Sequence, residues 1–375
     1  MTPIDRRAFV ALAAASAVPL PALARHAPAW ETRSSMPWAV QEIYCAVSGG
    51  RIVVVGGLLG LPGGRLRGVE DRVGVYDPAA DGWSEGPRLP QARHHPMVVA
   101  TDAGRVFAIG GYGETDAGQW TGMTETWSLD DGAWVPGPAL PEAQGETVGL
   151  AVGDRIHLIT GRTPSGEANG DWNDQGDVAT HRVLADGRWE DARPCPMARN
   201  SAAGAVLDGA LWVAGGRRVG GGGTGQLDRY DPAGDRWDTL APIPRSYASN
   251  NQVGGGLAMV AMGGKLVAFG GEWFAPGGGG VFAETWLYDP AADRWDKGPA
   301  MKTPRHGLAA AAVDGVAYAI GGSALVSSGA TTGAVEALRL WPNLSASPCA
   351  AAVTSAQVTS KPAASPNQGS ATAWP

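Results

Sequence analysis

A glycine-rich motif recurs along this chain and restricts the folds that the chain can adopt. Short apolar stretches end in a double glycine at five places, and a degenerate sixth copy ends in Thr160-Gly161. The complete copies are Gly56-Gly57, Gly110-Gly111, Gly215-Gly216, Gly270-Gly271 and Gly321-Gly322. Successive copies lie about 50 to 55 residues apart, and a fixed period of this size indicates an array of similar structural units.

Other residues repeat in phase with the double glycines. A tryptophan follows each of the first five copies by about two dozen residues, within a period of about 50; these are Trp83, Trp134, Trp189, Trp237 and Trp295. Three repeats carry Tyr-Asp-Pro before it, at Tyr76–Pro78, Tyr230–Pro232 and Tyr288–Pro290. This arrangement resembles the kelch repeats. The resemblance implies an all-β fold, a six-bladed kelch β-propeller, in which each tryptophan packs between neighbouring blades.

The sixth repeat predicts how the ring closes. Its chain runs through 335–341 and then loses the pattern, so the outer strand of this blade is missing. An aromatic followed by Met-Pro occurs instead at the other end, in Trp30–Pro37. We therefore expect the N-terminal strand to complete the last blade, because closure removes the exposed edges of the sheets.

The two ends of the chain differ from the repeats in composition. Residues 1–24 combine Arg6-Arg7-x-Phe9, an Ala-rich apolar run and a small-x-small sequence ending at Ala24. These features are typical of a cleaved export signal of the twin-arginine type, with a Sec-type signal as the alternative. We expect a propeller over 29–342, an Ala/Ser/Pro-rich disordered tail over 343–375, and a periplasmic or secreted location.

The composition excludes several kinds of binding partner for this protein. The formal net charge of -7 gives no electrostatic support for a nucleic-acid partner. The apolar run near the N-terminus is too short to span a membrane, and no later segment supplies one. The three cysteines, Cys45, Cys195 and Cys349, form no CxxC pair. The sequence predicts a monomer without cofactor.

Long loops on one face of the expected propeller point to function. The connection from the second to the third strand is long at 112–124, 162–176, 217–225 and 272–283, whereas the turn from the first to the second strand is short. In a propeller these long loops emerge on the same face as the links that enter each innermost strand. Elaborated loops on a rigid scaffold are where binding residues usually lie.

An arginine recurs in those entry links. Alignment back from the double glycines puts four of them at one place, namely Arg93, Arg199, Arg245 and Arg305. The third blade has Gln144 there, and the first has Val40–Glu42. The neighbours expected to join the arginines are Gln41, His94, Asn200 and His306. A ring of guanidinium groups around the channel mouth suits a carboxylate, sulfate or phosphate. Alternatively, these arginines bridge adjacent blades.

Aromatic and acidic residues lie near the same rim. Trp120, Trp172 and Trp273 occur in the long loops and could stack on a sugar ring, or instead fold over the blades as lids. Glu42 and Glu146 are the candidates for acid/base chemistry.

These features leave several functions open. The first is recognition of an anionic small ligand, a sugar acid, glycan or peptide. The second is a sugar mutarotase or epimerase acting at the same mouth, as the resemblance to kelch-type N-acetylneuraminate mutarotases implies. A copper-radical oxidase, as in the kelch propeller of galactose oxidase, is disfavoured because Tyr44, Cys45, His94, His95 and His306 are spread over several blades. The sequence therefore predicts no metal site.

Overall fold

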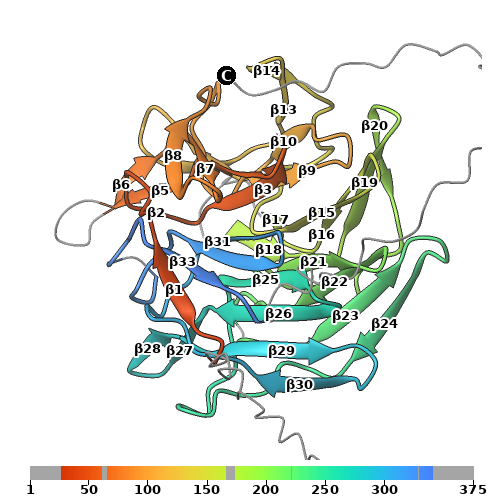
Figure 1. The fold of residues 1–375 in the computed structure, drawn as a ribbon. Coiled ribbons are helices and arrows are strands. Elements are labelled where there is room, and N and C mark those ends of the chain that lie inside the picture. Colours follow the sequence, from red (N-terminus) through yellow and green to blue (C-terminus); the bar gives the residue numbers. More distant parts are fainter. Residues whose placement is uncertain (1–26, 61–65, 166–173, 221, 328, 341–375) are drawn as a thin grey trace, which may run out of the picture.

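The computed structural model describes residues 27–60, 66–165, 174–220, 222–327 and 329–340. The expected export signal, the tail and Trp172 lie outside these residues. Within them the chain forms six four-stranded antiparallel sheets, arranged as blades around a central channel (Figure 1). In the described part of the chain no helix is long and apolar enough to cross a membrane.

Each blade is a meander that begins at the channel and ends at the outside. The innermost strands are β3 (Tyr44–Ser48), β9 (Met97–Ala100), β15 (Val148–Val152), β21 (Ala203–Leu207), β25 (Leu257–Met262) and β31 (Ala309–Val313). They contact one another in cyclic order, β31 lying against β3. The second strands are β4 (Arg51–Val55), β10 (Val106–Ile109), β16 (Arg155–Ile159), β22 (Ala210–Ala214), β26 (Lys265–Gly270) and β32 (Val316–Ile320).

The outer half of each blade carries the repeated aromatic residues. The third strands are β7 (Val73–Asp77), β13 (Thr126–Asp130), β19 (His181–Ala185), β23 (Leu227–Asp231), β29 (Thr285–Asp289) and β33 (Val335–Leu338). The outermost strands are β8 (Gly82–Glu85), β14 (Ala133–Pro136), β20 (Arg188–Asp191), β24 (Arg236–Leu240), β30 (Arg294–Lys297) and β1 (Trp30–Arg33).

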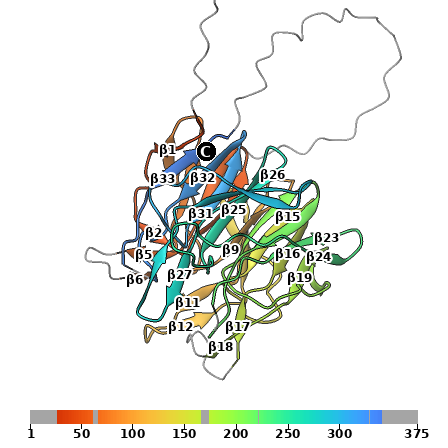
Figure 2. The ribbon, with the colours of Figure 1, turned by 90° about the horizontal axis from the view of Figure 1, so that it is seen from below.

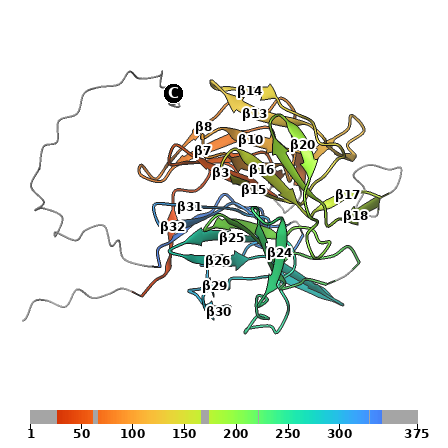
Figure 3. The same cartoon turned by 90° about the vertical axis from the view of Figure 1, so that its right-hand side faces the viewer.

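The N-terminal strand closes the ring, as predicted. β1 pairs antiparallel with β33, with Trp30 opposite Leu338, and so becomes the outer strand of the blade formed by β31, β32 and β33. Figures 1 and 3 both place the red N-terminal strand beside the blue last strands of the chain.

Apolar clusters fill the seams between blades. The cluster between the fifth and sixth blades contains Trp30, Phe269 and Leu308, and the next one, between the sixth and first, contains Ile43 and Tyr76. The double glycines adopt left-handed backbone conformations where the chain passes close to its neighbour. A Cβ on Gly56 would come within 2.4 Å of the Arg93 carbonyl oxygen, so only glycine fits there.

Short hairpins extend from the blades on one face. They are β11 (Tyr112–Glu114) with β12 (Trp120–Gly122), β17 (Arg162–Pro164) with β18 (Gln175–Asp177), β27 (Glu272–Ala275) with β28 (Gly278–Val281), and β5 (Leu58–Gly60), which pairs with β2 (Val40–Gln41) and β6 (Leu66–Val69). Figure 2 shows β5, β6, β11, β12, β17, β18 and β27 gathered toward one end of the molecule. This end is the elaborated face predicted from loop length.

Candidate functional site

A ring of six residues surrounds the channel mouth on the hairpin face. Each precedes an innermost strand and has a left-handed backbone, with φ between 50° and 67°. The six residues, which we call the mouth ring, are Glu42, His95, Glu146, Ser201, Gly256 and Gly307. Backbone hydrogen bonds join most neighbours around the ring; for example, Glu42 N donates to Gly307 O at 2.8 Å.

The backbone of the mouth ring explains why its side chains matter. A left-handed backbone costs a non-glycine residue roughly 1–2 kcal/mol. Two blades avoid this cost with glycine, whereas four keep Glu42, His95, Glu146 and Ser201 in that conformation. Strained positions of this kind cluster at functional sites.

A second ring lies next to the first. Its members directly follow the double-glycine positions: Leu58, Tyr112, Arg162, Arg217, Glu272 and Ser323. Each pairs through its backbone with the residue just before a mouth-ring position, as in the bridges of Tyr112 with His94 and of Arg217 with Asn200. The two rings bring charged side chains from different blades together at the mouth.

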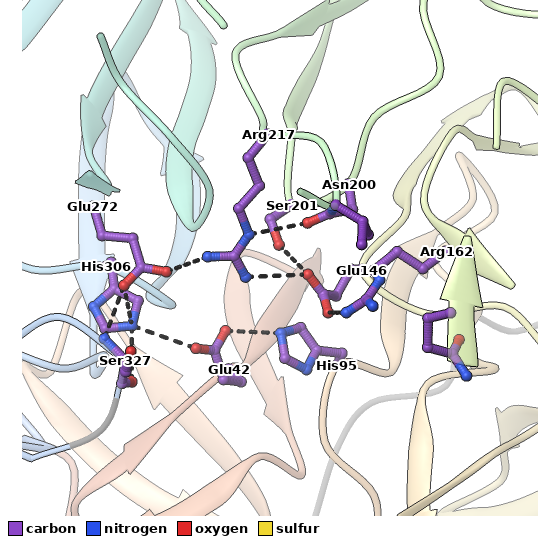
Figure 4. Close-up of polar contacts among 12 residues, drawn as sticks. Glu42, His95, Glu146, Arg162, Asn200, Ser201, Arg217, Glu272, His306 and Ser327 are labelled. Atoms are coloured by element: carbon purple, nitrogen blue, oxygen red, sulfur yellow. Dashed lines mark hydrogen bonds and ion pairs between the residues drawn. The ribbon is translucent and has the colours of Figure 1, made fainter. Parts of the chain in front are cut away.

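Glu146 lies between two arginines of the second ring (Figure 4). Arg162 Nη1 donates to Glu146 Oε1 at 3.2 Å and Arg217 Nη2 donates to Oε2 at 3.4 Å, while the Ser201 hydroxyl donates to Oε2. Burial would raise the pKa of Glu146, but the charges of His95, Arg217 and Arg162 hold it at about 2. Glu146 is therefore a fixed negative charge.

Glu42 lies between two histidines on the opposite side. His95 Nε2 is 2.8 Å from Glu42 Oε2, and His306 Nε2 is 3.5 Å from Oε1. Burial would raise the pKa of Glu42, but the charge of His95 and the hydrogen bond from His306 hold it well below its usual value. Burial would lower the pKa of both histidines, but Glu42 raises it in each.

Glu272 completes the network by joining its two halves. It accepts from Arg217 Nη1, lies 3.4 Å from His306 Nε2, and accepts from the Ser327 backbone at 2.9 Å. We call Glu42, His95, Glu146, Arg162, Arg217, Glu272 and His306 the mouth network. Arg217 is its most accessible cation, since its side chain is 17% exposed against 1% for Arg162.

Glycines at the mouth make room for these charges. A Cβ on Gly307 would come within 2.9 Å of the Glu42 carboxylate, and a Cβ on Gly255 would come within 3.1 Å of the Arg217 guanidinium. Small residues in the fifth and sixth blades therefore accommodate side chains from the first and fourth.

The expected ring of arginines is wrong, because none of its four members lines the mouth. Arg93, Arg199 and Arg305 are fully buried in the blade seams. Arg93 donates to the carbonyls of Gly110 and Glu125, Arg199 binds Asp228 at 2.8 Å, and Arg305 binds Glu336 at 3.1 Å. These guanidinium groups do not line the mouth. Each binds groups of its own blade, so these contacts join the entry link to that blade and do not bridge adjacent blades.

The fourth arginine was aligned in the wrong register. Gly254 occupies the equivalent position of the fifth blade, because an insertion lengthens the entry link there. Arg245 lies nine residues earlier, where its Nη1 donates to the carbonyl of Asn250 at 3.2 Å at the surface. Arg245 therefore does not stand at the channel mouth.

The remaining candidates lie at or beside the mouth network. His306 belongs to it, and Glu42 and Glu146 are its central carboxylates. Asn200 accepts from Arg217 Nε at 3.1 Å, and Gln41 donates to the Ser327 carbonyl at 2.8 Å.

The aromatic candidates take different positions. Trp120 covers His94, with ring centroids 4.4 Å apart. Trp273 lies on β27, where it packs against the apolar cluster of the fourth and fifth blades.

Sequence reasoning missed Arg162, Arg217 and Ser201 and did not weigh His95 as a ligand contact. The sequence does carry a signal for two of these residues, because Arg162 and Arg217 directly follow the repeated glycines.

Among the described residues, no group of three or more His, Cys, Asp or Glu has the arrangement of a metal site.

Below the network the channel is lined by uncharged side chains. A cavity of about 90 Å³ is lined by Tyr44, Cys45, Thr147, Met259 and neighbouring small residues. It continues toward the opposite face between the innermost strands, whose side chains there are mostly Val, Ala and Gly. Among the described residues, no charged one lines this cavity or its continuation, so the charged side chains of the channel belong to the mouth network.

Comparisons with known proteins agree with the fold. Family models described as Kelch motif match residues 42–90, 198–244 and 255–302. The Kelch-like protein terF of Aspergillus terreus (strain NIH 2624 / FGSC A1156) is 26% identical over 311 residues, covering 80% of this chain and 64% of that protein. Kelch-like protein 34 of Homo sapiens is 31% identical over 185 residues, covering 48% and 26%. The chain thus spans less than two thirds of these curated relatives.

A solved structure gives the same result. The structure of YjhT superposes with a TM-score of 0.66 at 15% identity and covers 81% of this chain and 96% of that chain. At this identity the likeness concerns the fold alone. Kelch motifs, Kelch-like relatives and a propeller closed by its own N-terminal strand together show that the chain belongs to the kelch-repeat β-propeller family.

Proposed function

We propose that the mouth network binds a small anionic, hydroxyl-rich ligand of the sugar-acid class. The observation that carries this proposal is the mouth ring, where four polar or charged side chains occupy left-handed positions that two other blades give to glycine. All four reach the same network. A fold that needed only a closed ring would be more stable with glycine at all six positions.

The charges of the mouth network favour an anion over a cation. With both histidines protonated, the network holds four positive groups, Arg162, Arg217, His95 and His306. It holds three carboxylates, on Glu42, Glu146 and Glu272, so its charge is 4 − 3 = +1. Arg217 is the group best placed to meet the ligand, because it is the more accessible of the two guanidinium groups and can offer a planar fork to a carboxylate.

The test uses two sugars that differ in one carboxylate. Glucuronate should bind the purified protein in calorimetry, and glucose should bind at least about tenfold more weakly, since a charge-assisted hydrogen bond contributes roughly 1.5–3 kcal/mol. Arg217→Ala should remove that difference. Arg229→Ala is the matched control, because Arg229 lies on the blade wall and pairs with Asp238 at 3.4 Å. Equal binding of the two sugars, or binding of neither, would refute the proposal.

A second candidate is catalysis of sugar ring opening, as in a mutarotase or epimerase. The two carboxylate–imidazole contacts of Glu42 favour it, because ring opening needs one group to donate a proton and one to accept it. Exchange between the anomers of glucuronate and of N-acetylneuraminate, followed by NMR, should accelerate in proportion to protein concentration. The acceleration should disappear in Glu42→Gln.

The proposal places this activity outside the cytoplasm. It rests on the twin-arginine pattern at Arg6-Arg7. Replacement of both arginines by lysine should leave the protein in the cytoplasmic fraction of a host with twin-arginine export. Unchanged export would contradict this route.

A further inference from the structure

Two adjacent histidines at the mouth face each other through the same ring nitrogen. His94 Nδ1 lies 2.7 Å from His95 Nδ1, and both side chains are buried. Nitrogen atoms at this distance are in contact only if one proton lies between them, because two protons would clash and two bare lone pairs would repel. The pair therefore holds one shared proton.

The far side of His95 fixes which histidine donates that proton. His95 Nε2 lies 2.8 Å from Glu42 Oε2, and the Glu42 carboxylate is ionised. Burial would lower the pKa of His95, but the charges of Glu42 and Glu146 raise it against the opposing charge of Arg217. The raised pKa of His95 and its contact with an ionised carboxylate favour a His95 that is protonated on both nitrogens, and its Nδ1 then donates to His94 Nδ1.

It follows that His94 is neutral and carries its hydrogen on Nε2. Burial and the charge of His95 both lower the pKa of His94. Within the described part of the chain this buried Nε2 has no hydrogen-bond partner. Buried polar groups are normally satisfied, and an exception at a candidate site calls for a ligand atom.

The surroundings of His94 suit a ring-shaped ligand. Its imidazole stacks on Tyr112, with ring centroids 5.2 Å apart, and Trp120 covers it while remaining 40% exposed. Gln175 Nε2 is another buried donor beside Tyr112 that has no partner among the described residues; the Oε1 of the same side chain is 3.5 Å from the tyrosine hydroxyl. A ligand that carries several oxygen atoms suits two unpartnered donors beside the same tyrosine.

We propose that His94 Nε2 is the atom that exchanges a proton with the bound ligand, that His95 relays that proton, and that the Glu42 carboxylate stabilises the charged form of His95. This inference rests on the proposed function. A ligand oxygen takes the hydrogen from His94 Nε2, while the proton on His95 Nδ1 crosses to His94 Nδ1. His95 becomes neutral and keeps its hydrogen on Nε2 toward Glu42, which remains a carboxylate. The protein loses one proton, the ligand gains it, and the reverse step returns it.

The test reads the ring protons directly in the full chain with 15N-labelled histidine. Two-bond 1H–15N spectra at neutral pH should show His95 protonated on both nitrogens and His94 protonated on Nε2 only, with a 15N–15N coupling between the Nδ1 atoms. Glu42→Gln should abolish the double protonation of His95. His157 and His181 are the internal control, because their facing nitrogens are 2.8 Å apart far from Glu42 and should not change.

The outcomes separate the relay from the proposed function. A neutral His95, a charged His94 or no coupling between the Nδ1 atoms in the unliganded protein would overturn the relay, whatever the protein binds. Addition of glucuronate should then shift His94 Nε2 and leave His157 Nε2 unchanged. Glucuronate that binds without this shift would leave the proposed site standing and refute the role of His94. Absence of binding in calorimetry would refute the proposed function instead.

Discussion

The indole Nε1 of Trp30 donates a 3.0 Å hydrogen bond to the carbonyl of Pro299, a residue 269 positions further along the chain. The tryptophans of the other blades make the same contact with the preceding blade: Trp134 with Pro87, Trp189 with Pro138, Trp237 with Arg193, Trp295 with Ala241 and Trp83 with Ser34. Trp30 is therefore the tryptophan of the sixth repeat, supplied from the other end of the chain.

This contact predicts that the N-terminal strand stabilises the whole propeller. A chain beginning at Ala39 lacks β1 and should unfold at a markedly lower temperature, because β33 loses its partner and the ring its closure. Trp30→Ala alone should cost about 3–5 kcal/mol, as expected for a buried tryptophan. Thermal unfolding measures both, with the half-exposed Trp120→Ala as control. Equal melting of the shortened and longer chains would disprove closure by β1.

The fold could be predicted because its signals are local and periodic. Double glycines recur where the backbone must be left-handed and close to a neighbour, and a tryptophan such as Trp237 recurs where blades meet. Closure was predictable because the sixth repeat lacks an outer strand, and an exposed sheet edge is unfavourable.

The site was predicted only in part because its geometry is not periodic. The sequence pointed to the hairpin face and to Glu42, Glu146 and His306 of the mouth network, but it could not show that Arg199 pairs with a carboxylate 29 residues away. The insertion before Gly254 also shifted the alignment of Arg245. Which arginines face the mouth depends on the second ring, whose side chains meet across blades.

The buried pair of Arg199 and Asp228 should be important for stability. Asp228 is fully buried and also accepts from Thr239 at 2.6 Å, so loss of the arginine leaves an uncompensated carboxylate. Arg199→Ala should destabilise the fold by about 3–5 kcal/mol in urea unfolding. The neighbouring control Arg229→Ala removes a partly exposed pair and should cost no more than about 1 kcal/mol. A loss for Arg199→Ala as small as for the control would contradict a structural role.

The mouth ring predicts an unusual order of stability at Ser201. Its φ is 50°, so alanine there keeps the strain of a left-handed backbone, whereas glycine does not. Both variants lose the hydrogen bond to Glu146. Ser201→Gly should therefore be more stable than Ser201→Ala by about 1 kcal/mol in urea unfolding. At the exposed Ser84 of β8 the order should reverse, since glycine weakens a strand. The same order at both positions would show that the mouth ring is not strained.

A second buried histidine pair, His157 and His181, should make the propeller sensitive to mild acid. Their facing nitrogens are 2.8 Å apart. Burial, together with the charge of His181, lowers the pKa of His157 to about 3. Burial also lowers the pKa of His181, to about 4. Unfolded histidine titrates near 6.5. Between pH 6.5 and about 4 the unfolded chain therefore binds more protons than the folded one, and stability falls as pH falls.

The expected slope is up to about 1.4 kcal/mol per pH unit for each histidine. Urea unfolding should be followed between pH 7 and pH 5, where the carboxylate of Glu146, with a pKa of about 2, stays ionised. His157→Gln combined with His181→Gln should flatten this dependence. His95 and His306 act in the opposite sense, because their raised pKa gives stability that is present below pH 6.5 and is lost as pH rises through the folded value. They are unchanged in the double variant, so the difference between the two proteins isolates the buried pair. His94, whose pKa burial also lowers, keeps its own smaller acid dependence in the double variant. An acid dependence that is as steep in the double variant as in the unchanged protein would place its origin elsewhere.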